Sequence, residues 1–80
     1  MSVQLTADGV IQLLDNCPSE DAETLLQHLS AQPEASVDWR LCDQAHAAVV
    51  QVLMAAGAEL RGPPRGAFLR EMVEPAMKAR

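Results

Sequence analysis

The stretch SVDWRLCDQAHAAVVQVLMAA, from Ser36 to Ala56, decides the fold of this chain. Val37-Asp38-Trp39 gives a short buried-strand signal, and a loop follows it. A helix then opens near His46, because the next apolar residues recur at helical spacing on one face: Val49, Val52, Leu53 and Ala56. Gly57 can end this helix in the left-handed conformation. A strand that feeds a helix is one half of a βαβ unit, whose sites form at the carboxyl ends of strands, so residues 40–48 are the first place to look for function.

The region before this stretch predicts a hairpin and a helix. Val3-Gln4-Leu5 and the apolar run from Val10 to Leu14 flank Asp8-Gly9, and Asp-Gly between two such runs is a strong hairpin signal. Ser19 is expected to cap the following helix. The apolar stripe of that helix consists of Ala22, Leu25, Leu26 and Leu29, and the helix should stop at Gln32-Pro33.

The region after Gly57 predicts a weak strand and a last helix. Ala58 to Arg61 reads as the strand, and Gly62-Pro63-Pro64 closes it. Pro75 should kink or end the helix near Glu74. The apolar side of this helix is expected to hold Phe68, Leu69, Met72, Val73 and Met77. The fold class is therefore a compact α/β domain with the order β-β-α-β-α-β-α, a mixed sheet of about four strands and three helices mainly on one face.

Composition points to one small globular domain, residues 1–80. The chain has 80 residues, 49% of them hydrophobic, and a chain this short has a marginal core that a partner or a weak homodimer could extend. The net charge of −5, with few dispersed basic residues, argues against nucleic-acid binding. The start lacks a basic region followed by an apolar run, and no apolar stretch approaches the roughly 20 residues that span a bilayer. We therefore expect a cytoplasmic protein without membrane insertion.

No catalytic or metal-binding constellation stands out. Cys42 and His46 are four residues apart, which on a helix would face both groups the same way. Cys17 and His28 could complete a zinc set with them, but those ligands are not closely paired, so we expect no metal and no cofactor. The two cysteines are expected to be reduced, buried thiols rather than a disulfide or a nucleophile. We expect no enzyme activity.

Two further residues of the central stretch carry expectations about burial. Asp38 sits at the end of a buried strand, and a buried carboxylate needs a partner, so it should cap a loop or pair with a basic group. Trp39 is expected in the core, with a partner surface as the alternative.

The central stretch resembles the STAS domain, the fold shared by anti-sigma-factor antagonists and the cytoplasmic tails of sulfate transporters. That family has a strand ending in Asp-Leu-Ser-Gly, a short loop, then Asp-Ser-Ser/Ala-Gly-Leu and an apolar helix. The strand end corresponds here to Val37-Asp38-Trp39-Arg40, the loop to Leu41-Cys42-Asp43-Gln44-Ala45, and the helix start to His46-Ala47-Ala48-Val49-Val50. The run Gln51 to Ala56 matches the family's helix, and the resemblance extends upstream over Gly9 to Leu29 and downstream over Leu60 to Pro64.

The departures from the family concern its switch. In regulatory STAS domains a partner kinase phosphorylates a serine or threonine at the start of this helix. Ala47 stands at that position, His46 replaces the preceding acidic residue, and Val49 replaces the glycine. No phosphorylation site is therefore carried over, and no phosphate is expected between Arg40 and Val52.

The resemblance implies a non-catalytic protein-interaction module in signal transduction. It would dock a regulatory partner, an anti-sigma-type kinase or a signalling scaffold, through the start of the central helix. The residues expected on that surface are Asp43, His46, Ala47 and Gln51. The alternative is an accessory STAS subunit of a lipid-trafficking ABC transporter, which would grip the transporter ATPase.

Overall fold

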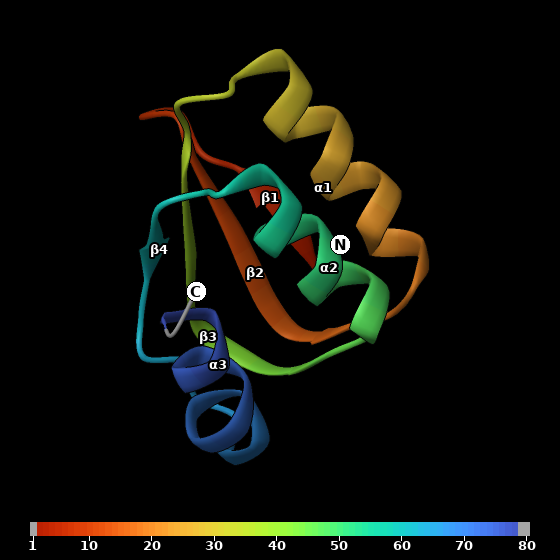
Figure 1. Ribbon diagram of the computed structural model, residues 1–80. Coiled ribbons are helices and arrows are strands. Elements are labelled where there is room, and N and C mark those ends of the chain that lie inside the picture. Colours follow the sequence, from red (N-terminus) through yellow and green to blue (C-terminus); the bar gives the residue numbers. More distant parts are fainter. Residues whose placement is uncertain (1, 79–80) are drawn as a thin grey trace.

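The computed structural model describes residues 2–78 and forms a mixed sheet with helices packed against it (Figure 1). The elements are β1 (Val3–Leu5), β2 (Val10–Cys17), α1 (Glu20–Ala31), β3 (Ser36–Ala45), α2 (Ala47–Ala56), β4 (Leu60–Arg61), a π-helical segment η1 (Leu69–Val73) and α3 (Glu74–Lys78). The four strands lie in the order β1-β2-β3-β4. β1 is antiparallel to β2, whereas β2, β3 and β4 run parallel. The predicted α/β class and element order are confirmed.

The N-terminal hairpin turns where the sequence predicts. Asp8 and Gly9 form the turn, and Gly9 has the positive φ of 80° that glycine adopts without strain. The hydroxyl of Thr6 donates to the Asp8 carboxylate, and this hydrogen bond lowers the pKa of Asp8. Val3 pairs with Leu13 across the hairpin, which points both side chains into the core.

Helix α1 covers one face of the sheet with a narrower apolar stripe than predicted. Leu25 and Leu29 are buried, but Leu26 is 51% exposed. The expected side-chain cap is also absent, because Ser19 has helical φ and ψ and its hydroxyl makes no capping bond. Instead, a backbone turn opens the helix, with the Ala22 N–H donating to the Ser19 carbonyl. The helix ends at Ala31, before the proline, as predicted.

The central strand β3 is longer than the sequence indicated. The expected loop from Arg40 begins as strand, and β3 continues to Ala45. β2 provides the reason, because its backbone pairs with β3 as far as Cys17 opposite Ala45, with two register shifts on the way. This pairing supplies hydrogen bonds to residues whose polar side chains suggested a loop.

Helix α2 lies beside α1 over the same face of the sheet (Figure 1). It begins at Ala47 and ends at Gly57, which has the predicted left-handed conformation (φ 62°). Val49 and Leu53 are fully buried, and Val52 packs half-buried against the same core. Trp39 is fully buried in that core, which confirms its expected position.

The last helix, which comprises η1 and α3 and begins at Ala67, accommodates Pro75 without ending. The turn before the proline widens to π-helical geometry, in which the Glu74 N–H donates to the Leu69 carbonyl. A π turn is a common local response where the regular helical ladder is disturbed. The predicted irregularity near Glu74 is present, but the helix does not end there and continues to Lys78.

The apolar side of the last helix is only partly buried. Leu69 is buried, and Val73 and Met77 pack half-buried against the core. Phe68 and Met72, predicted on the same side, are 67% and 63% exposed. The prediction is therefore wrong for these two residues, because the row that faces the core consists of Leu69, Val73 and Met77, and Phe68 and Met72 lie on the adjacent row of the helix.

Candidate functional site

Two helix starts meet the parallel strands β2 and β3 near the strand ends. The His46 N–H donates to the Cys17 carbonyl over 2.9 Å, so the end of β2 holds the start of α2. The Gly66 N–H donates to the Cys42 carbonyl, also over 2.9 Å, so β3 holds the start of the last helix. We call this region, the ends of β2 and β3 with the starts of α2 and the last helix, the carboxyl edge.

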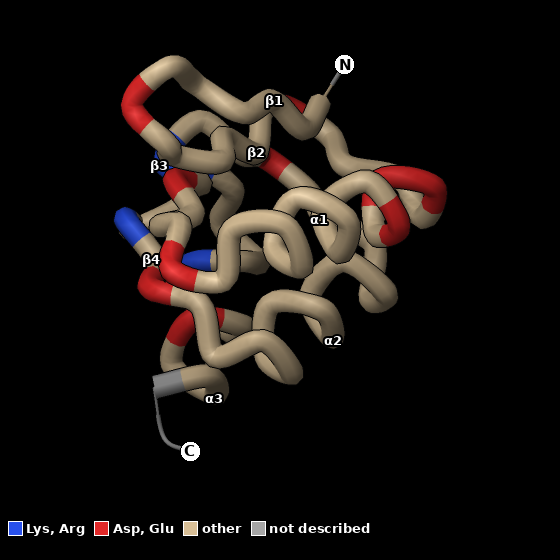
Figure 2. Tube along the Cα trace, turned by 90° about the horizontal axis from the view of Figure 1, so that it is seen from above, with Lys and Arg blue, Asp and Glu red and all other residues tan. Residues whose placement is uncertain are grey.

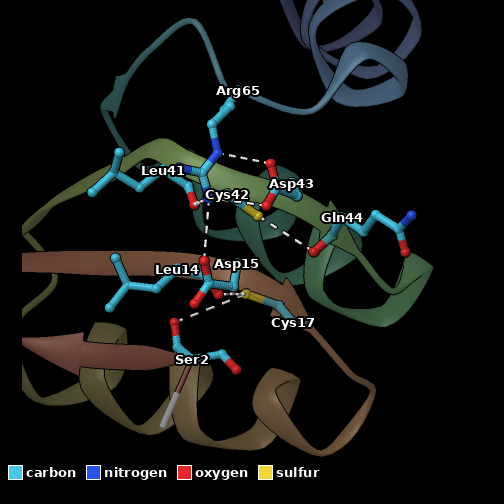
Figure 3. A network of polar contacts seen from close by, with 9 residues as sticks. All are labelled: Ser2, Leu14, Asp15, Cys17, Leu41, Cys42, Asp43, Gln44 and Arg65. Atoms are coloured by element: carbon cyan, nitrogen blue, oxygen red, sulfur yellow. Dashed lines mark hydrogen bonds and ion pairs between the residues drawn. The ribbon is translucent and has the colours of Figure 1, made fainter.

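The Arg65 side chain forms hydrogen bonds with residues of both β2 and β3 at the carboxyl edge (Figure 3). Its Nε donates to Asp43 Oδ1 over 2.8 Å and its Nη2 to Asp43 Oδ2 over 2.9 Å. The same Nη2 also donates to Asp15 Oδ1 over 3.1 Å and to the Leu41 carbonyl over 3.2 Å. The hydrogen bonds from Arg65 lower the pKa of Asp43, because they stabilise its ionised form. Asp43 thus fixes the geometry of the edge.

Asp15 reaches Arg65 through an unusual backbone conformation. Its φ is +54°, in the left-handed region that aspartate tolerates better than most residues. The register of β2 against β3 shifts just after it, between Asp15 and Asn16. Bulges of this kind re-aim side chains, and here the carboxylate turns toward the guanidinium of Arg65.

Gly66 lets the start of the last helix touch β3 directly. A Cβ built on Gly66 would lie 1.7 Å from the Asp43 carbonyl oxygen, so no side chain fits there. The sequence predicts a last helix that starts at Gly66 or Arg65, but it assigns neither residue to a site. In the sequence they appear only as a basic residue and a glycine after Pro63-Pro64. This pattern does not reveal which strand the two residues contact.

The remaining predicted site residues lie together at the start of α2. His46 is the N-cap residue, and its Nδ1 accepts a hydrogen bond from the Ala48 N–H over 3.0 Å. The side chains of His46, Ala47 and Gln51 are exposed. Asp43 lies on β3 rather than in a loop, and its carboxylate faces Arg65. Asp38, as expected, pairs with a basic group: Arg40 Nη2 donates to Asp38 Oδ2 over 2.7 Å.

The two cysteines lie beneath the carboxyl edge as free, buried thiols. A hydrogen bond to Cys42 and burial together raise the pKa of the Cys17 thiol. Cys42 donates to the Gln44 carbonyl and lies on a strand, so it shares no helical face with the exposed His46. The arrangement therefore provides no cysteine–histidine nucleophile pair. Among residues 2–78, no three His, Cys, Asp or Glu side chains are grouped so that they could hold a metal ion.

An exposed apolar side chain completes the edge. Phe68, the one phenylalanine of the chain, projects from the start of the last helix. It lines a groove of about 240 Å³ together with Leu69 and the end of β3, Asp43, Gln44 and Ala45. Met72 follows Phe68 one turn later and is similarly exposed. The groove joins Phe68 to the strand that leads into α2.

No family model, curated protein or solved structure matches this chain. In the part of the chain that the structure describes, no helix has the length and apolarity needed to cross a bilayer.

Proposed function

We propose that this chain is a non-catalytic, cytoplasmic, STAS-like protein-binding domain that docks its partner through the carboxyl edge. One observation carries the proposal: exposed Phe68 shares a groove with the end of β3, directly before the exposed start of α2. A large apolar side chain costs free energy when it faces water, and such residues in a polar rim are typical of protein-binding surfaces.

The polar groups of the edge support binding rather than chemistry. Arg65 engages both oxygens of Asp43, and the Ala48 N–H engages His46 Nδ1. These bonds hold the surface in one shape before a partner arrives, which lowers the entropic cost of association. A rigid surface with an aromatic anchor suits recognition of a folded partner.

The kind of partner comes from the resemblance to STAS domains. The element order agrees with that family, whose regulatory members meet their partners at the start of the corresponding helix. An anti-sigma-type kinase or a signalling scaffold is thus the proposed partner. Because Ala47 cannot accept phosphate, the interaction would not be switched at this position.

The test compares three immobilised proteins as baits in extract of the native host: the parent chain, Ala47→Glu and Phe68→Ser. Glu23→Gln, on the exposed outer side of α1, is the matched control. A protein held by the parent and the control but lost by both variants is then purified and titrated. A charge buried unpaired in an interface costs roughly 2–5 kcal/mol, so Ala47→Glu should weaken binding by at least about tenfold.

The identity of the recovered protein separates a signalling partner from a transporter ATPase. If Ala47→Glu and Phe68→Ser both bind the purified partner as tightly as the parent, the interface lies elsewhere and the proposal fails.

A further inference from the structure

The first turn of α2 is capped by a histidine ring that has to be neutral to act as a cap. His46 is the N-cap residue of this helix, and its Nδ1 accepts a hydrogen bond from the Ala48 N–H over 3.0 Å. An imidazole nitrogen accepts only while it carries no proton, so the proton of the capping ring lies on Nε2. Most N-cap residues use a side-chain oxygen, which does not take up a proton at this pH. A histidine cap is therefore sensitive to mild acid, whereas a serine or asparagine cap is not.

Protonation of the ring would remove the cap and add an unfavourable charge. The imidazolium ion donates from both nitrogens, so Nδ1 would become a donor that faces the N–H of Ala48. Its positive charge would lie at the positive end of the α2 dipole. α2 carries no charged residue along its length (Figure 2), and its first turn has no acidic residue that could offset this charge. Both effects favour an open first turn once the ring is protonated.

The His46 ring is exposed, so protons reach it directly from water. Within residues 2–78, no carboxylate forms an ion pair with this ring. The charged and titratable groups on the elements around it are Asp15 and Cys17 of β2, Glu20 and Asp21 of α1, Cys42 and Asp43 of β3, and Arg65 before the last helix.

Most of these neighbouring groups already have a counter-charge or carry no charge. Asp15 and Asp43 both pair with Arg65. A hydrogen bond to Cys42 and burial raise the pKa of Cys17, so this thiol stays uncharged. The two acidic residues of α1 lie in the first turn of that helix, where they offset the dipole of their own helix. The cap and the α2 dipole therefore dominate the response of His46 to acid.

The second histidine of the chain has the opposite setting. His28 lies in the last turn of α1, where the negative end of the helix dipole favours a cation. Protonation should therefore stabilise the helix at His28 and destabilise it at His46. Because the chain has two histidines, His28 supplies the internal control for an acid response that begins at His46.

We propose that His46 is a proton-sensitive cap, whose neutral ring holds the first turn of α2 closed and whose protonation in mild acid opens it. The open turn binds a proton that the capped turn excludes, so its population rises as the pH falls. Ala47, on the docking surface, follows the cap directly. This consequence rests on the proposed function and adds regulation to it: mild acid releases the partner from the carboxyl edge.

The test on the protein alone replaces His46 by asparagine, whose side-chain oxygen caps a helix without titrating. The parent and His46→Asn are unfolded with urea at about pH 7.5 and about pH 5.5, the range in which imidazole changes its charge. The ratio of the unfolding constant of the parent to that of His46→Asn should rise about fourfold between these pH values. Other titrating groups are common to both proteins and cancel. The same rise should appear when both proteins also carry His28→Gln.

Amide signals of isotope-labelled protein locate the opening. In mild acid the Ala48 amide should lose its hydrogen-bonded shift, and the Val49 amide, which donates to the His46 carbonyl, should lose protection from exchange. Protection in the last turn of α2 should not change. The proposal is overturned if the two unfolding constants keep the same ratio at both pH values, or if these two amides stay protected in acid.

Binding of the recovered partner is a separate arm of the test. A wash at about pH 5.5 should release the partner from the parent bait, whereas the His46→Asn bait should retain it. Equal release from both baits would overturn the regulation of docking. If no partner depends on the carboxyl edge, the proposed function fails, and the unfolding and amide measurements still decide the role of His46.

Discussion

Helix α2 and the last helix have similar apolar stripes in the sequence, yet they bury very different amounts of surface. α2 buries Val49 and Leu53 almost completely. Of the residues predicted on one side of the last helix, Leu69 is buried, whereas Phe68 and Met72 are mostly exposed. The difference shows that a helical apolar period establishes that a helix exists without establishing how deeply it packs.

The way each helix is held explains the difference. α2 lies along the sheet beside α1 and shares the central core. The last helix is fastened at its start, by the close backbone approach of Gly66 and by the Arg65 bonds. Along its length the last helix turns Leu69, Val73 and Met77 to the core, four residues apart, and this leaves the adjacent row of Phe68 and Met72 exposed.

The largest effect should come from a charge under α2. Leu53→Asp would place a carboxylate at a position that is 1% exposed, where it has no room for water. Removing the leucine side chain alone costs about 2–5 kcal/mol, so the domain should lose most of its stability. Leu26→Asp, at an exposed position of α1, is the control and should change the melt little. Cooperative unfolding of Leu53→Asp near the parental temperature would contradict this assignment of the core.

The next effect should be confined to the last helix. Gly66→Ala would force a Cβ against the Asp43 carbonyl, at a cost of about 3 kcal/mol for the backbone shift. Amide exchange in residues 67–78 should accelerate while exchange in α2 stays slow. Gly57→Ala is the comparison: nothing lies near its Cβ, but its φ of +62° costs about 1 kcal/mol. Equal acceleration in both helices would mean that the last helix is part of the central cooperative unit.

A smaller effect should follow from Arg65→Met, and it should depend on pH. Arg65 lowers the pKa of Asp43, so the pair stabilises the fold above the unfolded aspartate pKa of about 3.9. That contribution disappears as the pH falls through the lower folded pKa. The parent should therefore melt above the variant at neutral pH, and the gap should narrow in acid and in high salt. A gap independent of both conditions would mean that Arg65 acts through packing.

The smallest change in stability should come from Phe68→Ser. An exposed side chain contributes little to the fold, so the free energy of unfolding should move by less than about 0.5 kcal/mol. Binding at the carboxyl edge should fall much further, by about 2 kcal/mol or more if Phe68 is the anchor. Leu69→Ser, at the next and buried position, should instead lower the stability of the fold more than it weakens binding. The pair can be compared by thermal melt and by titration with the purified partner.

Part of the candidate site was accessible from the sequence. The helix start at His46 and the exposure of Ala47 and Gln51 follow from the apolar period of α2, because these positions fall off its buried stripe. The length of β3 did not follow, because its last residues form a strand by pairing with β2. The place of Arg65, Gly66 and Phe68 in the site did not follow either, because their partners lie on β2 and β3, far away along the chain.

By itself, the sequence determined the element order, the Asp8-Gly9 turn, the left-handed Gly57 and the burial of Trp39 and Leu53. These features depend on local backbone preferences and on the transfer of apolar side chains out of water. Both can be judged from residues that are neighbours in the sequence. The tertiary structure alone decided the extension of β3, the Arg65 bonds to Asp43 and Asp15, and the exposure of Phe68. Each of these depends on which segments meet, and close approach between distant segments is set by the packing of the whole domain.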